Sequence, residues 1–179
     1  MKILTLLRHA KSTWDDPVAR DFDRPLNRRG RKAARTVGAE MRRLGLAFDA
    51  VIASPATRVK ETLEEVEQGY GCALGTVFDP RIYLATSDTL IEIVRDADDA
   101  AERLLLVGHN PGLESIAIAL TSGRGLRDEV AVKYPTATLA EIELPAQSWD
   151  AVSAGSGHLA RFIRPRDLDP ALGPDEDSY

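Results

Sequence analysis

The stretch MKILTLLRHAKSTW, residues 1 to 14, places an arginine and a histidine directly after an apolar run. Residues 1–7 are rich in Leu, Ile and Thr, a composition typical of a buried β-strand. Charged side chains are costly inside such a strand, so we expect Arg8 and His9 at its C-terminal end, where the chain surfaces. In open α/β sheets ligands bind at these carboxyl ends, and the two residues are therefore candidates for a ligand site.

The rest of the chain alternates between short apolar runs and helix-like patterns, as in proteins built from βαβ units. Further strands are predicted at residues 48–53, 76–78, 104–107, 136–144 and 159–163. A helix is predicted after each of four start signals: a cap at Asn27, the pair Ser54-Pro55 as cap and first helical residue, a cap at Ser87, Asp88 or Thr89, and the GHNPG segment at 108–112. These elements predict an α/β protein.

The length of 179 residues suits a single domain with a sizeable core. We place this domain at residues 1–164, because residues 165–179 combine acidic residues with proline and glycine and are expected to form a flexible tail. The net charge of −5 argues against a nucleic-acid or membrane-surface partner, since both need a basic face. The basic run RRGRKAAR at 28–35 is interpreted as a solvated helix face.

The cysteine content and the lack of targeting signals in the sequence favour a reducing compartment. Cys72 is the single cysteine, so no internal disulfide can form. The sequence lacks a charged segment followed by an apolar leader, and it lacks the run of about eighteen apolar residues that a membrane span needs. We therefore expect a soluble cytoplasmic protein. Nothing in the sequence predicts its oligomeric state.

Arginines and histidines recur at three predicted strand ends. Arg8 and His9 follow the first strand, Arg58 lies in the first turn of the helix after the second, and His109 follows the strand at 104–107. In a mostly parallel sheet these positions share one edge, beside helix N-termini with free N–H groups, and together they predict an anion pocket. Guanidinium groups pair in bidentate fashion with phosphate oxygens, so a phosphate dianion fits this pocket better than a carboxylate.

The same residues suggest a chemical reaction. A histidine whose free ring nitrogen faces an electrophile can act as a nucleophile, so His9 is predicted to attack phosphorus and form a phosphohistidine that water then hydrolyses. Arg8 and Arg58 would stabilise the developing charge. His109 would act as a protonated donor, because the charge of a bound phosphate raises its pKa above about 6.5.

Several segments also carry a family resemblance. LLRHAKSTW (6–14) resembles the Arg-His-Gly/Ala signature of the histidine phosphatase (phosphoglycerate mutase-like) superfamily, and SPATRVKET (54–62) is similar to its second motif. FDRPLNRRGRKAA (22–34) resembles its Arg-Pro-Leu block, GHNPG its Gly-His segment and YPTATLAEIEL (134–144) its late strand. The short length most resembles the SixA-type phosphohistidine phosphatases.

This resemblance implies a three-layer fold, with a mostly parallel central sheet that includes one antiparallel strand and has helices on both faces. It implies His9 as nucleophile, Arg8, Arg58 and His109 as the phosphate pocket, and no metal ion or other cofactor. Arg24, from the Arg-Pro-Leu block, and Asn110 are assigned to substrate binding, with a surface loop charge as the alternative for Arg24.

The sequence departs from the family where a proton donor is expected. The glutamate that mutase and acid phosphatase relatives use as general acid is missing from DPRIYLATSDTL (79–90), where Tyr83 and Asp88 are the remaining candidates and Asp88 is more simply a helix cap. Asp15, at a position where many relatives carry asparagine, is excluded from the site as an anion. A phosphoramidate can be protonated on its own imidazole, so the missing acid favours a phosphohistidine substrate.

Three functions remain open at this point. The first is a phosphatase that acts on phosphohistidine of a signalling or phosphotransfer protein, and the second is a phosphomonoesterase for a small metabolite. The third is a module that binds a phosphorylated ligand without turnover. A metal site on His9 and His109 would need a third ligand, and His158, in the segment SAGSGH (153–158), has no partner at a suitable spacing.

Overall fold

The computed structural model describes residues 1–17 and 20–173, and within them the strands form one sheet. Its order is β3-β2-β4-β1-β5-β6, with β1 (Lys2–Arg8), β2 (Ala50–Ala53), β3 (Val77–Phe78), β4 (Arg103–Gly108), β5 (Leu139–Leu144) and β6 (His158–Ile163). Neighbouring strands pair in parallel from β3 to β1, whereas β5 is antiparallel to both β1 and β6. The predicted sheet, mostly parallel with one antiparallel strand, is confirmed.

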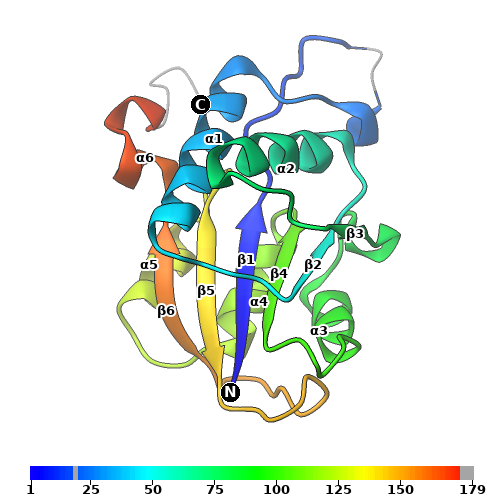
Figure 1. Cartoon of the computed structure of the whole chain (residues 1–179), viewed down its shortest axis with the longest axis vertical. Coiled ribbons are helices and arrows are strands. Elements are labelled where there is room, and N and C mark those ends of the chain that lie inside the picture. The colour runs from blue at the N-terminus through cyan, green and yellow to red at the C-terminus, as the bar shows by residue number, and fades with distance from the viewer. Residues whose placement is uncertain (18–19, 174–179) are drawn as a thin grey trace.

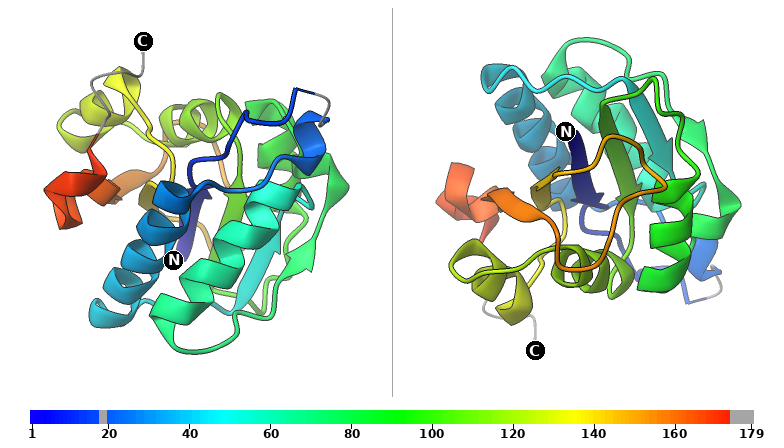
Figure 2. Two further views of the ribbon diagram at one scale, coloured as in Figure 1. Left: turned by 90° about the horizontal axis from the view of Figure 1, so that it is seen from above. Right: turned by 90° about the horizontal axis from the view of Figure 1, so that it is seen from below.

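Helices cover both faces of this sheet and give the predicted three layers (Figures 1 and 2). One face carries α1 (Arg28–Arg43) and α2 (Thr57–Tyr70), and the other carries α3 (Ser87–Arg95), α4 (Gly112–Leu120) and α5 (Leu126–Val132). The short helix α6 (Pro165–Leu168) follows β6. The described residues also contain three 3-10 turns: η1 (Asp21–Asp23), η2 (Pro80–Ile82) and η3 (Pro170–Leu172).

The apolar run of β4 explains why the sheet needs helices on both sides. Leu104 and Leu106 pack in the core beneath α3, α4 and α5, while Leu105 and Val107 pack in the core beneath α1 and α2. All four side chains are fully buried. A continuous apolar strand is therefore covered on both faces, because successive side chains point to opposite sides.

Helix starts agree with the sequence prediction in two cases and differ in two, and one agreement is α4, which begins at Gly112 at the end of the GHNPG segment. The side chain of Asn27 accepts a hydrogen bond from the Gly30 N–H at 2.8 Å, so the predicted cap of α1 is confirmed. The predicted start at Ser54-Pro55 is wrong, because α2 begins at Thr57 and its N-cap makes no side-chain bond. Ser54 instead continues the direction of β2, since its N–H donates to the carbonyl of Val107 at 3.0 Å.

The other differences are small shifts of element boundaries. The cap of α3 is Thr86, whose hydroxyl accepts from the Thr89 N–H, so the predicted cap at Ser87, Asp88 or Thr89 is wrong by one residue or more. The predicted strand at 136–144 begins only at Leu139, because Ala137 adopts a left-handed turn conformation with φ of 54°.

Part of the segment predicted as a flexible tail forms α6 and η3. These elements contact α1 through the ion pair of Asp169 with Lys32, at 3.2 Å, and through a hydrogen bond that Arg29 donates to the carbonyl of Gly173. Residues 174–179 of the predicted tail lie outside the described residues.

Two glycines bring α1 and α2 into backbone contact. A Cβ atom on Gly38 would lie 2.2 Å from the carbonyl oxygen of Val66, and a Cβ atom on Gly69 would lie 2.1 Å from that of Arg35. Any side chain at either position would force the helices apart, so their packing depends on glycine at both.

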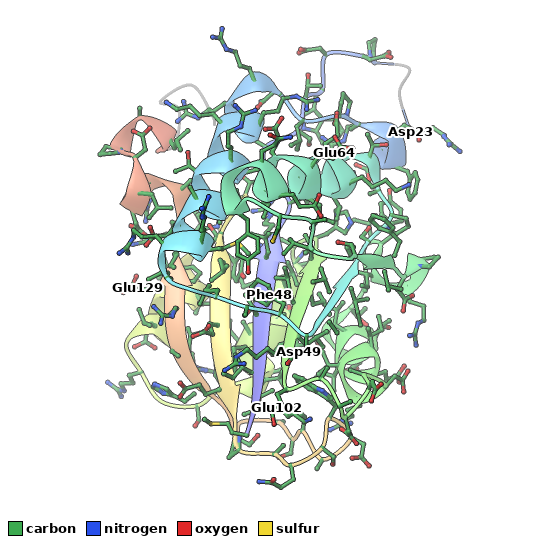
Figure 3. All side chains as sticks on the ribbon, viewed as in Figure 1. Asp23, Phe48, Asp49, Glu64, Glu102 and Glu129 are labelled. Carbon is green, nitrogen blue, oxygen red and sulfur yellow. The ribbon has the colours of Figure 1, made fainter. Side chains whose placement is uncertain are left out.

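The two edges of the parallel strands differ in what they carry. At the N-terminal edge, Asp49 accepts hydrogen bonds from the N–H groups of Glu102 and Arg103, each at 2.9 Å, and Figure 3 shows Asp49 and Glu102 at this end. The candidate site lies at the opposite, C-terminal edge, where Figure 3 labels Asp23. In the described part of the chain, no helix has the length and apolar character to cross a membrane.

Candidate active site

Three polar residues sit immediately beyond three adjacent parallel strands. His9 follows β1 and donates its backbone N–H to the carbonyl of Gly108 at 3.0 Å. His109 follows β4, and Ser54 follows β2 with its own N–H bonded to β4. Because these backbone bonds continue the ladder of the sheet, the three side chains are held at one edge by the strands themselves.

Arg58 joins this group from the first turn of α2. Its Nε lies 3.4 Å from Nε2 of His9, and the residue is 2% exposed. The buried hydroxyl of Thr62 accepts the Ala10 N–H at 2.9 Å and donates to the Arg58 carbonyl at 2.6 Å. Thr62 therefore ties the residue after His9 to the helical turn that carries Arg58.

The tautomer of His9 follows from its hydrogen bond. Nδ1 lies 2.7 Å from the carbonyl oxygen of Ala10, which can only accept, so Nδ1 carries the proton and Nε2 keeps its lone pair. Burial lowers the pKa of His9 to about 3, and the nearby charges of Arg8 and Arg58 also favour the neutral ring. The unprotonated Nε2 thus faces Arg58 near neutral pH.

His109 contacts Ser54 through one ring nitrogen and leaves the other without a partner. Its Nε2 lies 2.7 Å from Oγ of Ser54, whereas its Nδ1 is buried and has no hydrogen-bond partner among the described residues. Its ring centroid is 5.3 Å from that of His9. Burial first, and then Arg58, lower the pKa of His109 to about 4. This describes the free site, whereas the predicted rise concerns the site with phosphate bound.

An acidic side chain reaches the same group from η1. Asp21 places Oδ2 3.1 Å from Nη2 of Arg58, and the hydroxyl of Tyr83 donates to that oxygen at 2.5 Å. Arg58 also donates from Nη1 to the Asp21 carbonyl at 2.7 Å. Burial opposes ionisation of Asp21, but the bond from Tyr83 and the charges of Arg58 and Arg24 outweigh it and hold the pKa of this carboxyl below its usual range.

Arg24 lies beside this carboxylate and is not a freely solvated charge. It is 7% exposed, donates to Oδ1 of Asp21 at 3.1 Å and to Oγ of Ser12 at 2.8 Å, and stacks on the ring of Trp14 at 3.4 Å. The alternative interpretation as a surface loop charge is therefore wrong. Its contact with Arg58 runs through Asp21.

The guanidinium of Arg8 is hydrogen-bonded at its terminal nitrogen but not at Nε. Its Nη1 donates to the carbonyl of Tyr134 at 2.8 Å, while its buried Nε has no hydrogen-bond partner within the described ranges. Burial lowers the pKa of Arg8, although a guanidinium remains charged at any physiological pH. The orphan Nε is available to a bound anion.

Asn110 and Asp88, two residues named from the sequence, lie outside the group around His9. The side chain of Asn110 donates to the carbonyl of Tyr134 at 3.0 Å and accepts from the Glu114 N–H at 3.2 Å, so both ends of its amide bond the backbone. Asp88 is exposed in the first turn of α3, and no hydrogen bond in the described parts of the chain joins it to the group around His9. Tyr83, in contrast, lies edge-on to the ring of His109 at 5.4 Å.

Sequence reasoning missed Ser54, Asp21 and Thr62. Ser-Pro is a common helix start, so the sequence predicts a cap at Ser54, and only its place after β2 shows its contact with His109. Asp21 had no local signal, since η1 brings it to Arg58 across 37 residues of sequence. Thr62 could have been found from its spacing of one helical turn after Arg58.

The assembled side chains can bind a phosphorylated anion and transfer its phosphoryl group. An unprotonated histidine nitrogen, an unpaired histidine nitrogen and two guanidinium groups converge, and the two histidines are only 7% and 4% exposed. Arginine donors in a water-poor site stabilise charge that develops on phosphoryl oxygens. No group of three or more potential metal-ligating side chains occurs in the searched residues 1–17 and 20–173.

Comparison with known proteins places this geometry in context. The model of the histidine phosphatase superfamily (branch 1) matches residues 4–82, which include Arg8, His9 and Arg58. An uncharacterized protein of Mycobacterium tuberculosis is 35% identical over 164 residues, covering 89% of this chain and 100% of that protein.

Solved structures with the same fold span nearly the whole chain. A protein of Agrobacterium tumefaciens, provisionally identified as phosphohistidine phosphatase SixA, has a TM-score of 0.77 and 27% identity and covers 92% of this chain and 98% of its own. The protein histidine phosphatase SixA in complex with tungstate has a TM-score of 0.76, with 93% of this chain and 99% of that chain covered. At 18% identity this second likeness concerns the fold alone.

Proposed function

The chain belongs to the histidine phosphatase superfamily and is SixA-like, and on that premise we propose that it removes the phosphoryl group from phosphohistidine on a protein. The observation that carries this proposal is the orientation of His9. Its Nδ1–H bonds the Ala10 carbonyl, so the lone pair of Nε2 faces Arg58 beside the ring of His109. That arrangement supports a nucleophile poised against an arginine-bound phosphoryl group.

In the first step Nε2 of His9 attacks phosphorus. The P–N bond of the donor breaks, and its electron pair returns to the departing imidazole nitrogen. Arg58 and the unpaired Nε of Arg8 bind the phosphoryl oxygens. We assign the Ser54 hydroxyl as donor to Nε2 of His109, 2.7 Å away, so that Nδ1 of His109 carries a hydrogen and donates it to a third oxygen.

In the second step a water molecule attacks the phosphorus held on His9. The new P–O bond replaces the P–Nε2 bond, and the electron pair returns to Nε2. The carboxylate of Asp21, which Tyr83, Arg58 and Arg24 keep ionised by lowering its pKa, takes one proton of this water. Side chains alone complete this cycle, and it needs no metal ion.

The same ionised carboxylate supports a phosphoramidate substrate. An alkoxide leaving group needs a proton from the enzyme, and Asp21 in its charged form has none to give. An imidazole leaving group protonates on its own second nitrogen, so its P–N bond breaks without a strong enzyme acid. A protein-borne phosphohistidine is therefore a suitable substrate, because its leaving group needs no proton from this site.

The test is a comparison of kcat/KM on a phosphohistidine-bearing phosphotransfer protein and on small phosphate monoesters. We expect a preference of at least about a hundredfold for the phosphohistidine, consistent with the usual contribution of a general acid to alkoxide departure. Equal or greater kcat/KM on a monoester would contradict the phosphohistidine assignment.

One observation favours a second candidate, a phosphatase for a small metabolite. His9, Arg58 and His109 are 7%, 2% and 4% exposed, and Asp21 and Tyr83 lie against Arg58, so a slender substrate would reach phosphorus more easily than a protein surface. A high kcat/KM on one monoester in the same panel would favour this candidate.

A further inference from the structure

A cavity of about 240 Å³ adjoins Arg8 on the β5 side of the sheet edge. It lies between the first turns of α1, the segment before β5 and the start of α6, whereas Arg58 and His109 lie on the β2 and β4 side of β1. The cavity is therefore next to the candidate active site but separate from it, and Arg8 belongs to both.

The wall of this cavity is strongly basic. No acidic residue belongs to its described lining, which includes six basic side chains: Arg8, Lys11, Arg29, Lys133, Arg164 and Arg166. The whole protein has a net charge of −5, so this positive patch is a local feature and not a reflection of overall composition.

Two of these cations make no close ion pair, although the charge of Arg166 contributes to the lowered pKa of Asp167. Lys133 and Arg166 are exposed, and no ion pair or hydrogen bond engages their side chains within the part of the chain that the structure describes. Arg164 differs, since it pairs with Asp167 at 2.9 Å and with Glu129, labelled in Figure 3, at 3.5 Å. Lys133 and Arg166 thus place exposed positive charge at the rim of the cavity, beside the buried guanidinium of Arg8.

We propose that this basic cavity is a second anion subsite, which holds a carboxylate or phosphate group carried by the phosphoryl donor next to the phosphoryl group that is transferred. The inference rests on the proposed function, because the shared residue Arg8 is what links the subsite to the reacting phosphoryl group. It narrows the substrate class to donors with acidic groups beside the phosphoryl group, and it disfavours donors whose leaving group is uncharged.

The central experiment compares two phosphohistidine peptides of equal length, one with glutamates and one with glutamines beside the phosphohistidine. The wild-type protein is expected to prefer the glutamate peptide about tenfold in kcat/KM, mainly through KM, because complementary charge acts on association and binding. The double variant Lys133→Glu/Arg166→Glu should abolish this preference. Its kcat/KM on p-nitrophenyl phosphate, which lacks a second anion, should stay within about twofold of wild type.

The matched control is Arg103→Glu/Arg124→Glu. Both arginines are exposed and lie at the opposite edge of the sheet, Arg103 at the start of β4 and Arg124 in the loop that leads from α4 to α5. This control makes the same change in net charge and should keep the tenfold preference. A wild-type protein without the preference, or a cavity variant that retains it, would overturn the subsite.

A second pair of donors separates the two sources of the anion. Phosphoserine carries a carboxylate that phosphoethanolamine lacks. A charge preference confined to the peptides identifies an acidic protein as donor, and one confined to the small esters identifies an acidic metabolite. Both outcomes support the subsite.

A binding measurement keeps this inference distinct from the proposed function. The unphosphorylated glutamate peptide should bind the wild-type protein in isothermal titration calorimetry, bind at least about fivefold more weakly to the cavity variant and weaken as salt is raised. Binding of this kind with no turnover of any donor would retain the subsite and reject the phosphatase. Equal binding to both proteins, or none, would reject the subsite.

Discussion

The Asp21 carboxylate lies 3.1 Å from Nη2 of Arg58, so an internal anion occupies the guanidinium that we assign to the phosphoryl group. Arg58 is bonded twice to the same residue, since its Nη1 also donates to the Asp21 carbonyl. An incoming phosphate must therefore share or displace this carboxylate. In the free site the contact with Asp21 holds Arg58 in place, and a bound substrate has to share or replace that contact.

Asp21→Asn should strengthen phosphate binding and slow turnover. Removing the negative charge removes the competitor on Arg58, so the inhibition constant of tungstate should fall several-fold. Loss of the proton acceptor should lower kcat by about 10²-fold or more and let the phosphoenzyme accumulate. The control is Asp23→Asn in the same turn η1, where Asp23 pairs with the exposed Arg20. An unchanged kcat in Asp21→Asn would exclude this residue from proton transfer.

His9→Ala should abolish turnover while leaving anion binding in place. The variant lacks the Nε2 that we assign as nucleophile, so kcat should fall by at least about 10³-fold and no acid-labile phosphoenzyme should form. Tungstate should still bind, because the two arginines remain. His158→Ala provides a matched loss of an exposed histidine at the start of β6 and should behave as wild type. A labelled phosphoenzyme in His9→Ala would refute the assignment.

Ser54→Ala tests the tautomer of His109. The hydroxyl of Ser54 lies 2.7 Å from Nε2 of His109, and without it the ring is free to protonate Nε2 in place of Nδ1. We expect kcat/KM to fall about tenfold. Nitrogen NMR of the histidine ring should show a change from the Nδ1–H to the Nε2–H form, and an unchanged spectrum would mean that another contact sets the tautomer.

The low pKa values of His9 and His109 predict a loss of stability in mild acid. Their pKa values are about 3 and about 4 in the folded protein, against about 6.5 in the unfolded chain. Between these limits the unfolded state binds more protons, so the free energy of unfolding falls as pH decreases from 7.5 to 5, by about 2 kcal/mol for each histidine.

Urea unfolding at pH 7.5 and pH 5 measures this contribution. His9→Asn removes one titrating group, so its stability should fall by about 2 kcal/mol less over the same interval than that of wild type. Equal losses in the two proteins would mean that His9 titrates normally when folded.

Thr62→Val should weaken both the fold and the site. Valine preserves the shape of the side chain but leaves the buried Ala10 N–H without its acceptor, at a cost of about 1–3 kcal/mol in the free energy of unfolding. Because Thr62 also bonds the Arg58 carbonyl, kcat should fall as well. Chemical denaturation with parallel assays tests both effects, and a variant as stable as wild type would show that water replaces the hydroxyl.

The part of the site that could be predicted from sequence is the part built by regular elements. His9 and His109 end apolar strands, and Arg58 lies in the first turn of a helix, so the topology of a parallel sheet brings them together. Residues 104–107 predicted a strand because every side chain in them is apolar, and all four are buried. Local pattern and global fold agree at these positions.

The remaining features depend on contacts between distant segments. Ser54 has the local pattern of a helix cap, but its backbone bond to Val107 keeps it in line with β2. Asp21 reaches Arg58 through η1, and no apolar periodicity in the sequence predicts this turn. The basic cavity combines Arg8 with Arg166, which are separated by most of the chain, so no window of sequence contains it.

The glycine contact between α1 and α2 has a consequence for how the protein moves. Because the backbones touch at Gly38 and Gly69, neither helix can slide or roll past the other without a steric clash. Backbone amides along this contact should therefore exchange with deuterium only when the whole domain unfolds, whereas those of η1 should exchange through local opening. Arg58, at the start of α2, therefore belongs to the part of the chain that we expect to open last, whereas its partner Asp21 belongs to a turn that we expect to open locally.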